Sequence, residues 1–188
     1  LEHTPHVFLG WRGAMALASP DDLLLETTPD QQSRWTRAHR AGNLDPAGYA
    51  YAEADTVGTV GLDSEGRLSA GSSTGGVFGK MPGRVGDTPI FGAGFYASEQ
   101  VAVVGTGIGE LFIETLGCLR VAQLVEGGRD PQGACDDVIG LLGARRKLPA
   151  ALLALDGEGR IGAACQGGSF SVEGPDGPVE PVSFDGET

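Results

Sequence analysis

The sequence predicts a layered α+β fold, in which antiparallel sheets are flanked by helices. Two observations predict this class. The apolar segments come in the order strands, two helices, strands along the chain. Consecutive strands are joined by short hairpin turns, which makes neighbouring strands antiparallel and leaves the helices to cover the outer faces of the sheets.

Size and composition narrow the class of protein. With 188 residues, 40% of them apolar, the chain suits a single domain with a buried core. No apolar run is long enough to span a membrane. The net charge of −12 argues against a nucleic-acid partner, because phosphate binding needs an excess of Lys and Arg. The three cysteines lack metal-like spacing and are expected to be buried thiols, which fits a reducing, cytoplasmic compartment.

The first 55 residues predict a short strand at 6–9, one helix and a linker. Thr28 and Pro29 are a favourable N-cap and first helical residue, and the helix is expected to run to about Arg40 before Gly42. The small and polar residues of 43–55 predict a mobile linker.

The rest of the chain alternates between hairpins and helices. The expected strands are 56–62, 67–72, 100–104, 150–156, 160–165, 169–173 and 179–184, and the expected helices are 109–125 and 131–142. A turn with the same pattern, Asp-x-Glu-Gly-Arg, occurs at 63–67 and 156–160, with glycine at the left-handed position. We interpret the repetition as shared turn chemistry. The glycine-rich connection 73–94 is long enough to suggest a functional loop.

Thr56 is the first candidate for chemistry. It heads an apolar strand that we expect to be buried, and it directly follows the linker. Cleavage of the bond between Asp55 and Thr56 would give Thr56 a free α-amine beside its own hydroxyl, and that pair is a known means of activating a threonine nucleophile. An ordinary β-propensity threonine is the alternative interpretation.

Two further segments carry candidate binding groups. Arg84 offers a fork for a carboxylate, and Asp87 offers a partner for an ammonium group, so together they suit a free amino acid. A structural Arg–Asp pair is the alternative. The segment 105–110, GTGIGE, lies between a strand and a helix and superficially suits a dinucleotide. Glu110 replaces the third glycine there, so an oxyanion hole made by a glycine turn and the Thr106 hydroxyl is the better interpretation.

Several motifs resemble those of the N-terminal-nucleophile asparaginases. These motifs are PHVFLGWRGA, TVGTVGLD, SSTGG, GRVGDTPIFGAGFYA and TGIGE, and they extend over most of the chain. The family comprises plant-type L-asparaginase/isoaspartyl peptidases and glycosylasparaginases. The resemblance implies a four-layer αββα sandwich made as a precursor that cuts itself between Asp55 and Thr56.

The resemblance also implies roles for individual residues. Thr56 would be the nucleophile and Thr74 the hydroxyl that supports it, while Thr106 and Gly107 would form the oxyanion hole.

Substrate would be held by three residues in this resemblance. Arg84 would bind the α-carboxylate, and Asp87 would bind the α-amine with help from Gly109. The substrate would be asparagine, a β-aspartyl peptide or, as the alternative within the family, N-glycosylated asparagine. An inactive or incomplete homologue is the alternative outside enzymes.

The domain interpretation follows the expected cleavage. Residues 1–55 would be the end of the family's α-part with the linker, and 56–188 the β-part, together forming one domain with a truncated N-terminal portion. No cofactor or metal is expected, because the family's sodium-binding loop has no counterpart here. The family forms dimers of processed pairs, and we expect the same assembly here.

Overall fold

The described residues of this computed structural model are 28–42, 56–81, 83–168 and 170–183. The chain divides into two compact units, Leu1–Asp45 and Pro46–Thr188. The predicted strand at 6–9 and the linker 43–55 lie outside the described residues.

The described part of the first unit is one helix, α2 (Pro29–Arg40). Thr28 caps it as predicted: its side chain accepts from the backbone N–H of Gln31, and the Gln31 side chain accepts from the backbone N–H of Thr28. This reciprocal capping box satisfies two backbone donors that a helix start leaves unpaired. Gly42 follows the helix in the left-handed conformation, with φ of 69°.

The described part of the second unit contains three sheets. Its elements are β1 (Val57–Leu62), β2 (Leu68–Ser73), β3 (Phe95–Ala97), β4 (Val101–Gly107), α3 (Gly109–Thr115), α4 (Gly117–Glu126), α5 (Pro131–Arg145), β5 (Ala150–Asp156), β6 (Ile161–Gln166), β7 (Val172–Gly174), β8 (Gly177–Val179) and β9 (Val182–Ser183). The central sheet has the order β3-β4-β5-β6-β9, and β1-β2 and β7-β8 are separate hairpins.

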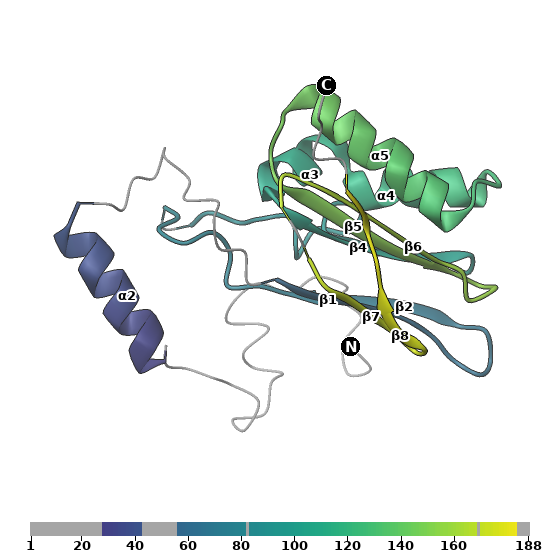
Figure 1. Cartoon of the computed structure of the whole chain (residues 1–188), viewed down its shortest axis with the longest axis horizontal. Coiled ribbons are helices and arrows are strands. Elements are labelled where there is room, and N and C mark those ends of the chain that lie inside the picture. Colours follow the sequence, from purple (N-terminus) through teal and green to yellow (C-terminus); the bar gives the residue numbers. More distant parts are fainter. Residues whose placement is uncertain (1–27, 43–55, 82, 169, 184–188) are drawn as a thin grey trace. The chain divides into compact units, whose positions relative to one another are not determined.

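These elements stack in layers (Figure 1). Helices α4 and α5 pack on one face of the central sheet, and the β1–β2 hairpin packs on the other, mainly against β4. The apolar core lies between the helices and the central sheet, with Phe112, Leu111, Ile139, Leu142 and Leu152 fully buried. The α+β class is therefore as predicted. A helix layer outside the β1–β2 hairpin is not among the described residues of this unit, so the four-layer sandwich stays a prediction.

Four details of the predicted elements were wrong. The strand at the head of the hairpin is not buried, because β1 belongs to a two-stranded sheet with one covered face, and Val57 is 71% exposed. The strand expected at 100–104 continues to Gly107, since the glycine-rich segment still pairs with β5. The strand expected at 179–184 is divided by Pro181, which cannot donate a ladder hydrogen bond. Finally, β9 is parallel to β6, so the central sheet is not wholly antiparallel.

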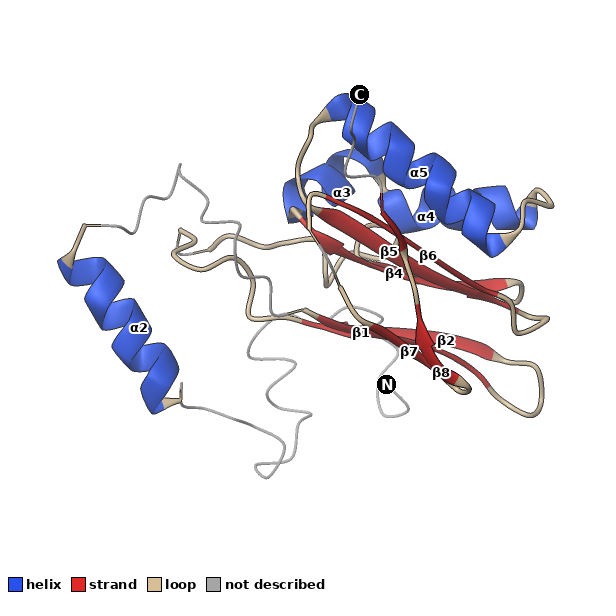
Figure 2. Cartoon of the chain, in the orientation of Figure 1, coloured by secondary structure: helices blue, strands red, loops and turns tan. Residues whose placement is uncertain are grey.

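The helix predicted at 109–125 is two helices. The chain breaks at Leu116, whose φ of 51° is left-handed, between α3 and α4 (Figure 2). The break lets the Phe112 ring lie against two glycines: a Cβ atom would come within 2.5 Å of this ring at Gly105 and 2.8 Å at Gly117. Both glycines are therefore needed for this packing.

Candidate active site

Thr56 and Thr74 meet at the open end of the β1–β2 hairpin. Thr56 immediately precedes β1 and Thr74 immediately follows β2, and the register pairs Val57 with Ser73. The Thr56 hydroxyl donates to Thr74 Oγ1 over 3.1 Å. Thr74 Oγ1 also accepts from the backbone N–H of Gly76 over 3.0 Å. The loop after β2 therefore fixes the Thr74 hydroxyl beside that of Thr56.

A cavity of about 720 Å³ lies between the hairpin and the central sheet. Its lining includes Thr56 at the start of β1 and Thr106 near the end of β4, while the segment around β7 lines another side. The cavity thus brings together two hydroxyls that are 50 positions apart in the sequence. Its size is in the range of small-molecule sites.

Thr106 and Gly107 occupy the end of β4. Thr106 Oγ1 is one of three buried side-chain oxygen or nitrogen atoms in the described part of the chain that have no hydrogen-bond partner. Gly107 has a φ of 128°, and a Cβ atom there would lie 2.2 Å from the carbonyl oxygen of Pro149. Only glycine fits this position, and Thr106 offers a hydroxyl with no competing partner among the residues that the structure describes.

Arg84 and Asp87 lie near the start of α3. A Cβ atom at Gly109 would be 2.7 Å from Asp87 Oδ1 and 3.0 Å from Arg84 Nη2. Gly109 therefore allows both side chains to approach the helix start closely. The three predicted substrate-binding residues are brought together by the fold.

The Arg84 guanidinium is held by a residue that the sequence interpretation did not include in the site. Its Nε and Nη2 atoms donate to the two carboxylate oxygens of Glu110, each over 2.9 Å. Arg84 lowers the pKa of the Glu110 carboxyl through these hydrogen bonds. One feature of the sequence indicates this pairing with Arg84. A carboxylate lies in the first turn of a helix, directly after a glycine-rich segment.

Asp87 has an unfavourable environment for a carboxylate. It is 6% exposed, and its Oδ2 atom has no hydrogen-bond partner in the described part of the chain. Burial raises the pKa of the Asp87 carboxyl, which Arg84 partly opposes. A buried acceptor without a partner is suited to receive a donor from a ligand.

The remaining predicted site features have different outcomes. Asp55 lies outside the described residues, so the carbonyl side of the expected cleavage bond has no structural description. All three cysteines are buried thiols, as predicted. Within the described ranges, no group of three or more His, Cys, Asp or Glu side chains is arranged to hold a metal ion. The expectation that the protein needs no cofactor stays a prediction.

A layered α+β unit with a threonine at the head of a strand is the arrangement expected of an N-terminal-nucleophile hydrolase. The family model described as asparaginase matches residues 1–173. The chain belongs to this asparaginase family.

No helix in the described part of the chain combines the length and the apolar character needed to cross a bilayer.

Three relatives show the range of this family. An isoaspartyl peptidase of Salmonella typhimurium is 40% identical over 181 residues, which cover 86% of this chain and 55% of the relative. An N(4)-(β-N-acetylglucosaminyl)-L-asparaginase of Elizabethkingia miricola is 34% identical, with 92% of this chain and 54% of the relative covered. A plant-type L-asparaginase of Pyrobaculum calidifontis is 46% identical over 57% of this chain and 37% of the relative. The chain thus spans about half the length of the first two relatives.

Proposed function

We propose that the protein is a self-processing threonine amidohydrolase that acts on the side-chain amide of asparagine or on β-aspartyl peptides. The observation that carries the proposal is the hydrogen bond between the hydroxyls of Thr56 and Thr74, 3.1 Å long, beside a cavity that Thr106 also lines. Thr56 and Thr106 line one cavity, and Thr74 is hydrogen-bonded to Thr56. Such a group of hydroxyls suits an acyl-transfer reaction, in which one attacks and the others orient it or stabilise charge.

Processing comes first in this proposal. The Thr56 hydroxyl attacks the carbonyl carbon of Asp55, and its proton passes to the departing amide nitrogen of Thr56. The resulting ester is hydrolysed by water, which leaves a carboxylate on Asp55 and a free α-amine on Thr56. An unperturbed α-amine has a pKa of about 7.7–8.0, so it can accept a proton near neutral pH.

Hydrolysis of the substrate repeats the same bond changes. Thr56 Oγ1 attacks the side-chain carbonyl of the substrate while the α-amine takes the hydroxyl proton. The Thr106 hydroxyl and the backbone at Gly107 stabilise the developing oxyanion. Ammonia or an amine then leaves with a proton, and water cleaves the ester to release aspartate. Side-chain and backbone groups of the chain supply every step, so the reaction needs no cofactor.

The substrate is held by its amino-acid end. Arg84 binds the α-carboxylate, and Asp87 accepts from the α-ammonium group with help from the backbone at Gly109. The Oδ2 atom of Asp87 has no hydrogen-bond partner in the described part of the chain, and this supports the role because an incoming ammonium group would satisfy it. The functional assembly in this proposal is a dimer of processed pairs.

Hydrolysis of glycosylated asparagine is the second candidate. Its support is the Elizabethkingia miricola relative, which is named for that activity and covers 92% of this chain. The two activities share the nucleophile and the clamp for the amino-acid end, and they differ only in the leaving group.

The test compares three substrates with one protein. Ammonia release from asparagine, aspartate release from a β-aspartyl dipeptide and cleavage of an N-acetylglucosaminyl-asparagine compound are measured side by side. The proposal expects one of the first two to be fastest, and dominant cleavage of the third would favour the second candidate. The Thr56→Ala variant should lose all three activities; activity that survives this change would overturn the assignment of the nucleophile. A chain that never processes and hydrolyses none of the three would be an inactive homologue.

A further inference from the structure

Arg84 and Asp87 form the proposed clamp for the amino-acid end of the substrate, and Arg84 also pairs with Glu110. Positive and negative charges are therefore unequal in number in this group. A guanidinium presents more than one edge to carboxylates, and Glu110 occupies the edge formed by Nε and Nη2, with both contacts at 2.9 Å. Both side chains are largely shielded, with 14% exposure for Arg84 and 31% for Glu110. A resident carboxylate therefore already compensates much of the Arg84 charge.

Asp87 adds a second carboxylate to the same group. Burial raises the pKa of the Asp87 carboxyl; the Arg84 charge opposes this rise and the Glu110 charge adds to it, so both charges act on this buried carboxyl. One cation then faces two anions, and the group has a net charge of −1 when all three are ionised. The Asp87 Oδ2 atom, which is buried and has no partner among the described residues, is the uncompensated acceptor.

We propose that Glu110 determines specificity by making an α-ammonium group obligatory in the ligand. The inference rests on the proposed function, because it takes the clamp of Arg84 and Asp87 as the site for the amino-acid end. A ligand with a carboxylate alone brings a third anion to one cation. A ligand that also carries an ammonium group restores the balance and satisfies Asp87. Selectivity of this kind depends on a repulsive element as much as on an attractive one.

Glu110 acts through Arg84, so it is a positioning and specificity residue. Its change should alter which ligands bind and the KM, with a smaller effect on kcat. A residue that only stabilises the fold would instead affect ligands with and without the ammonium group equally.

The test is calorimetric titration with L-aspartate and with succinate, which differ only in the α-ammonium group. The variants are Glu110→Gln and Glu110→Ser, which remove the charge, and Glu110→Asp, which keeps it. Glu114→Gln is the matched control, because Glu114 lies on the same helix and pairs with Arg146 over 3.0 Å. We expect the parent, Glu110→Asp and Glu114→Gln to prefer aspartate strongly. The neutral Glu110 variants should lower the aspartate-to-succinate affinity ratio roughly tenfold.

Three outcomes would overturn the inference. The parent could bind aspartate and succinate equally, or bind neither. The neutral Glu110 variants could lower the affinity for both ligands by the same factor, or Glu114→Gln could change the affinity ratio as much as Glu110→Gln. The first needs no variant to fold. A parent that binds aspartate selectively but hydrolyses no amide would contradict the proposed function and leave this inference standing.

Discussion

Two residues of the candidate site, Asp87 and Thr106, each have one buried side-chain oxygen atom with no hydrogen-bond partner among the described residues, whereas buried polar groups normally have one. Such groups reduce stability, so their presence at a predicted site is best explained by a ligand that completes them. Thr74 is the opposite case, since its hydroxyl accepts from Thr56 and from the Gly76 N–H. At the scale of single residues, the site therefore combines the hydrogen-bonded hydroxyl of Thr74 with two side-chain oxygens, on Asp87 and Thr106, that a ligand could hydrogen-bond.

Removing the Thr74 hydroxyl should slow catalysis without unfolding the protein. We expect Thr74→Val to lower kcat by up to about tenfold, because the hydroxyl that orients Thr56 Oγ1 is lost and a hydrogen bond between neutral groups contributes about 0.5–1.5 kcal/mol. Thr74→Ser keeps the hydroxyl and is the matched control. Steady-state kinetics distinguish the two, and equal rates in Thr74→Val and the parent would contradict the supporting role.

Replacing Asp87 with Asn should make the protein more stable and less active. Burial raises the pKa of Asp87, so its ionised form costs stability at pH values above that raised pKa. At neutral pH the variant should gain about 1 kcal/mol, the lower end of the cost of a buried unpaired polar group. As pH falls through the raised pKa toward the ordinary value of about 3.9, the parent becomes neutral and the gain should shrink.

Urea denaturation of the parent and Asp87→Asn at several pH values measures this difference. Ligand binding should fall in the variant at neutral pH, because Asn cannot balance an ammonium charge. A variant that is less stable than the parent across the whole pH range would show that Asp87 stabilises the fold instead.

Among the elements, the junction between β4 and α3 carries half of the residues of the candidate site. Thr106, Gly107, Gly109 and Glu110 lie within five consecutive positions, where the chain leaves a strand and enters a helix. The sequence predicted this concentration, because a glycine-rich segment between an apolar run and a helix is recognisable. It did not predict that the strand continues to Gly107, since glycine is depleted in strands and the pairing with β5 is what includes this segment in the sheet.

The break between α3 and α4 stores backbone strain at one leucine. Leu116 adopts a left-handed conformation and is 41% exposed, so its side chain gains little from burial. Leu116→Gly should be more stable than Leu116→Ala by about 1 kcal/mol, because glycine has no Cβ atom to strain there. Thermal unfolding of both variants measures the difference. Equal stability of the two would mean that the left-handed conformation costs little.

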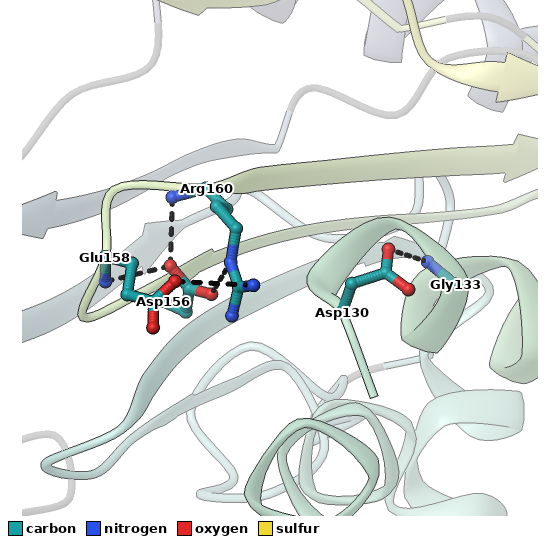
Figure 3. Close-up of polar contacts among 5 residues, drawn as sticks. All are labelled: Asp130, Gly133, Asp156, Glu158 and Arg160. Atoms are coloured by element: carbon teal, nitrogen blue, oxygen red, sulfur yellow. Dashed lines mark hydrogen bonds and ion pairs between the residues drawn. The ribbon is translucent and has the colours of Figure 1, made fainter. Parts of the chain in front are cut away.

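The two Asp-x-Glu-Gly-Arg turns have the same geometry in different surroundings. In each, the aspartate accepts from two backbone N–H groups and from the arginine side chain; Figure 3 shows this for Asp156, with the helix cap Asp130 nearby. The side chain of Asp156 is 4% exposed, whereas that of Asp63 is 40% exposed. The predicted interpretation as repeated turn chemistry agrees with these matching contacts.

Burial should decide which of the two turns matters for stability. Asp156→Ala removes a buried carboxylate that accepts three hydrogen bonds, and it should destabilise the protein by about 1.5–3 kcal/mol. Asp63→Ala is the matched control, and its effect should be smaller because water can replace the lost acceptor. Chemical denaturation of the two variants compares them, and equal losses would show that turn geometry outweighs burial.

For the whole molecule, the sequence predicted the class of fold and most elements, but not all of the pairing. Two strands joined by a short turn pair with each other, so the pairing of β1 with β2 and of β5 with β6 was predictable. The three-residue strand β3 and the parallel strand β9 were not, because their only signal is the neighbour they pair with. The Arg84–Glu110 pair was missed for the same reason, since 26 positions separate two residues that only the fold brings together.

The central claim is that Thr56 becomes the N-terminal nucleophile of an amidohydrolase. Incubating the purified chain and then sequencing the N-terminus of each band on a denaturing gel tests it most directly. We expect a new band whose sequence begins Thr56-Val57-Gly58, with amide hydrolysis rising as that band accumulates. The Thr56→Ala variant should stay a single band. A chain that remains uncut while hydrolysing amides, or that is cut elsewhere as activity appears, would contradict the account.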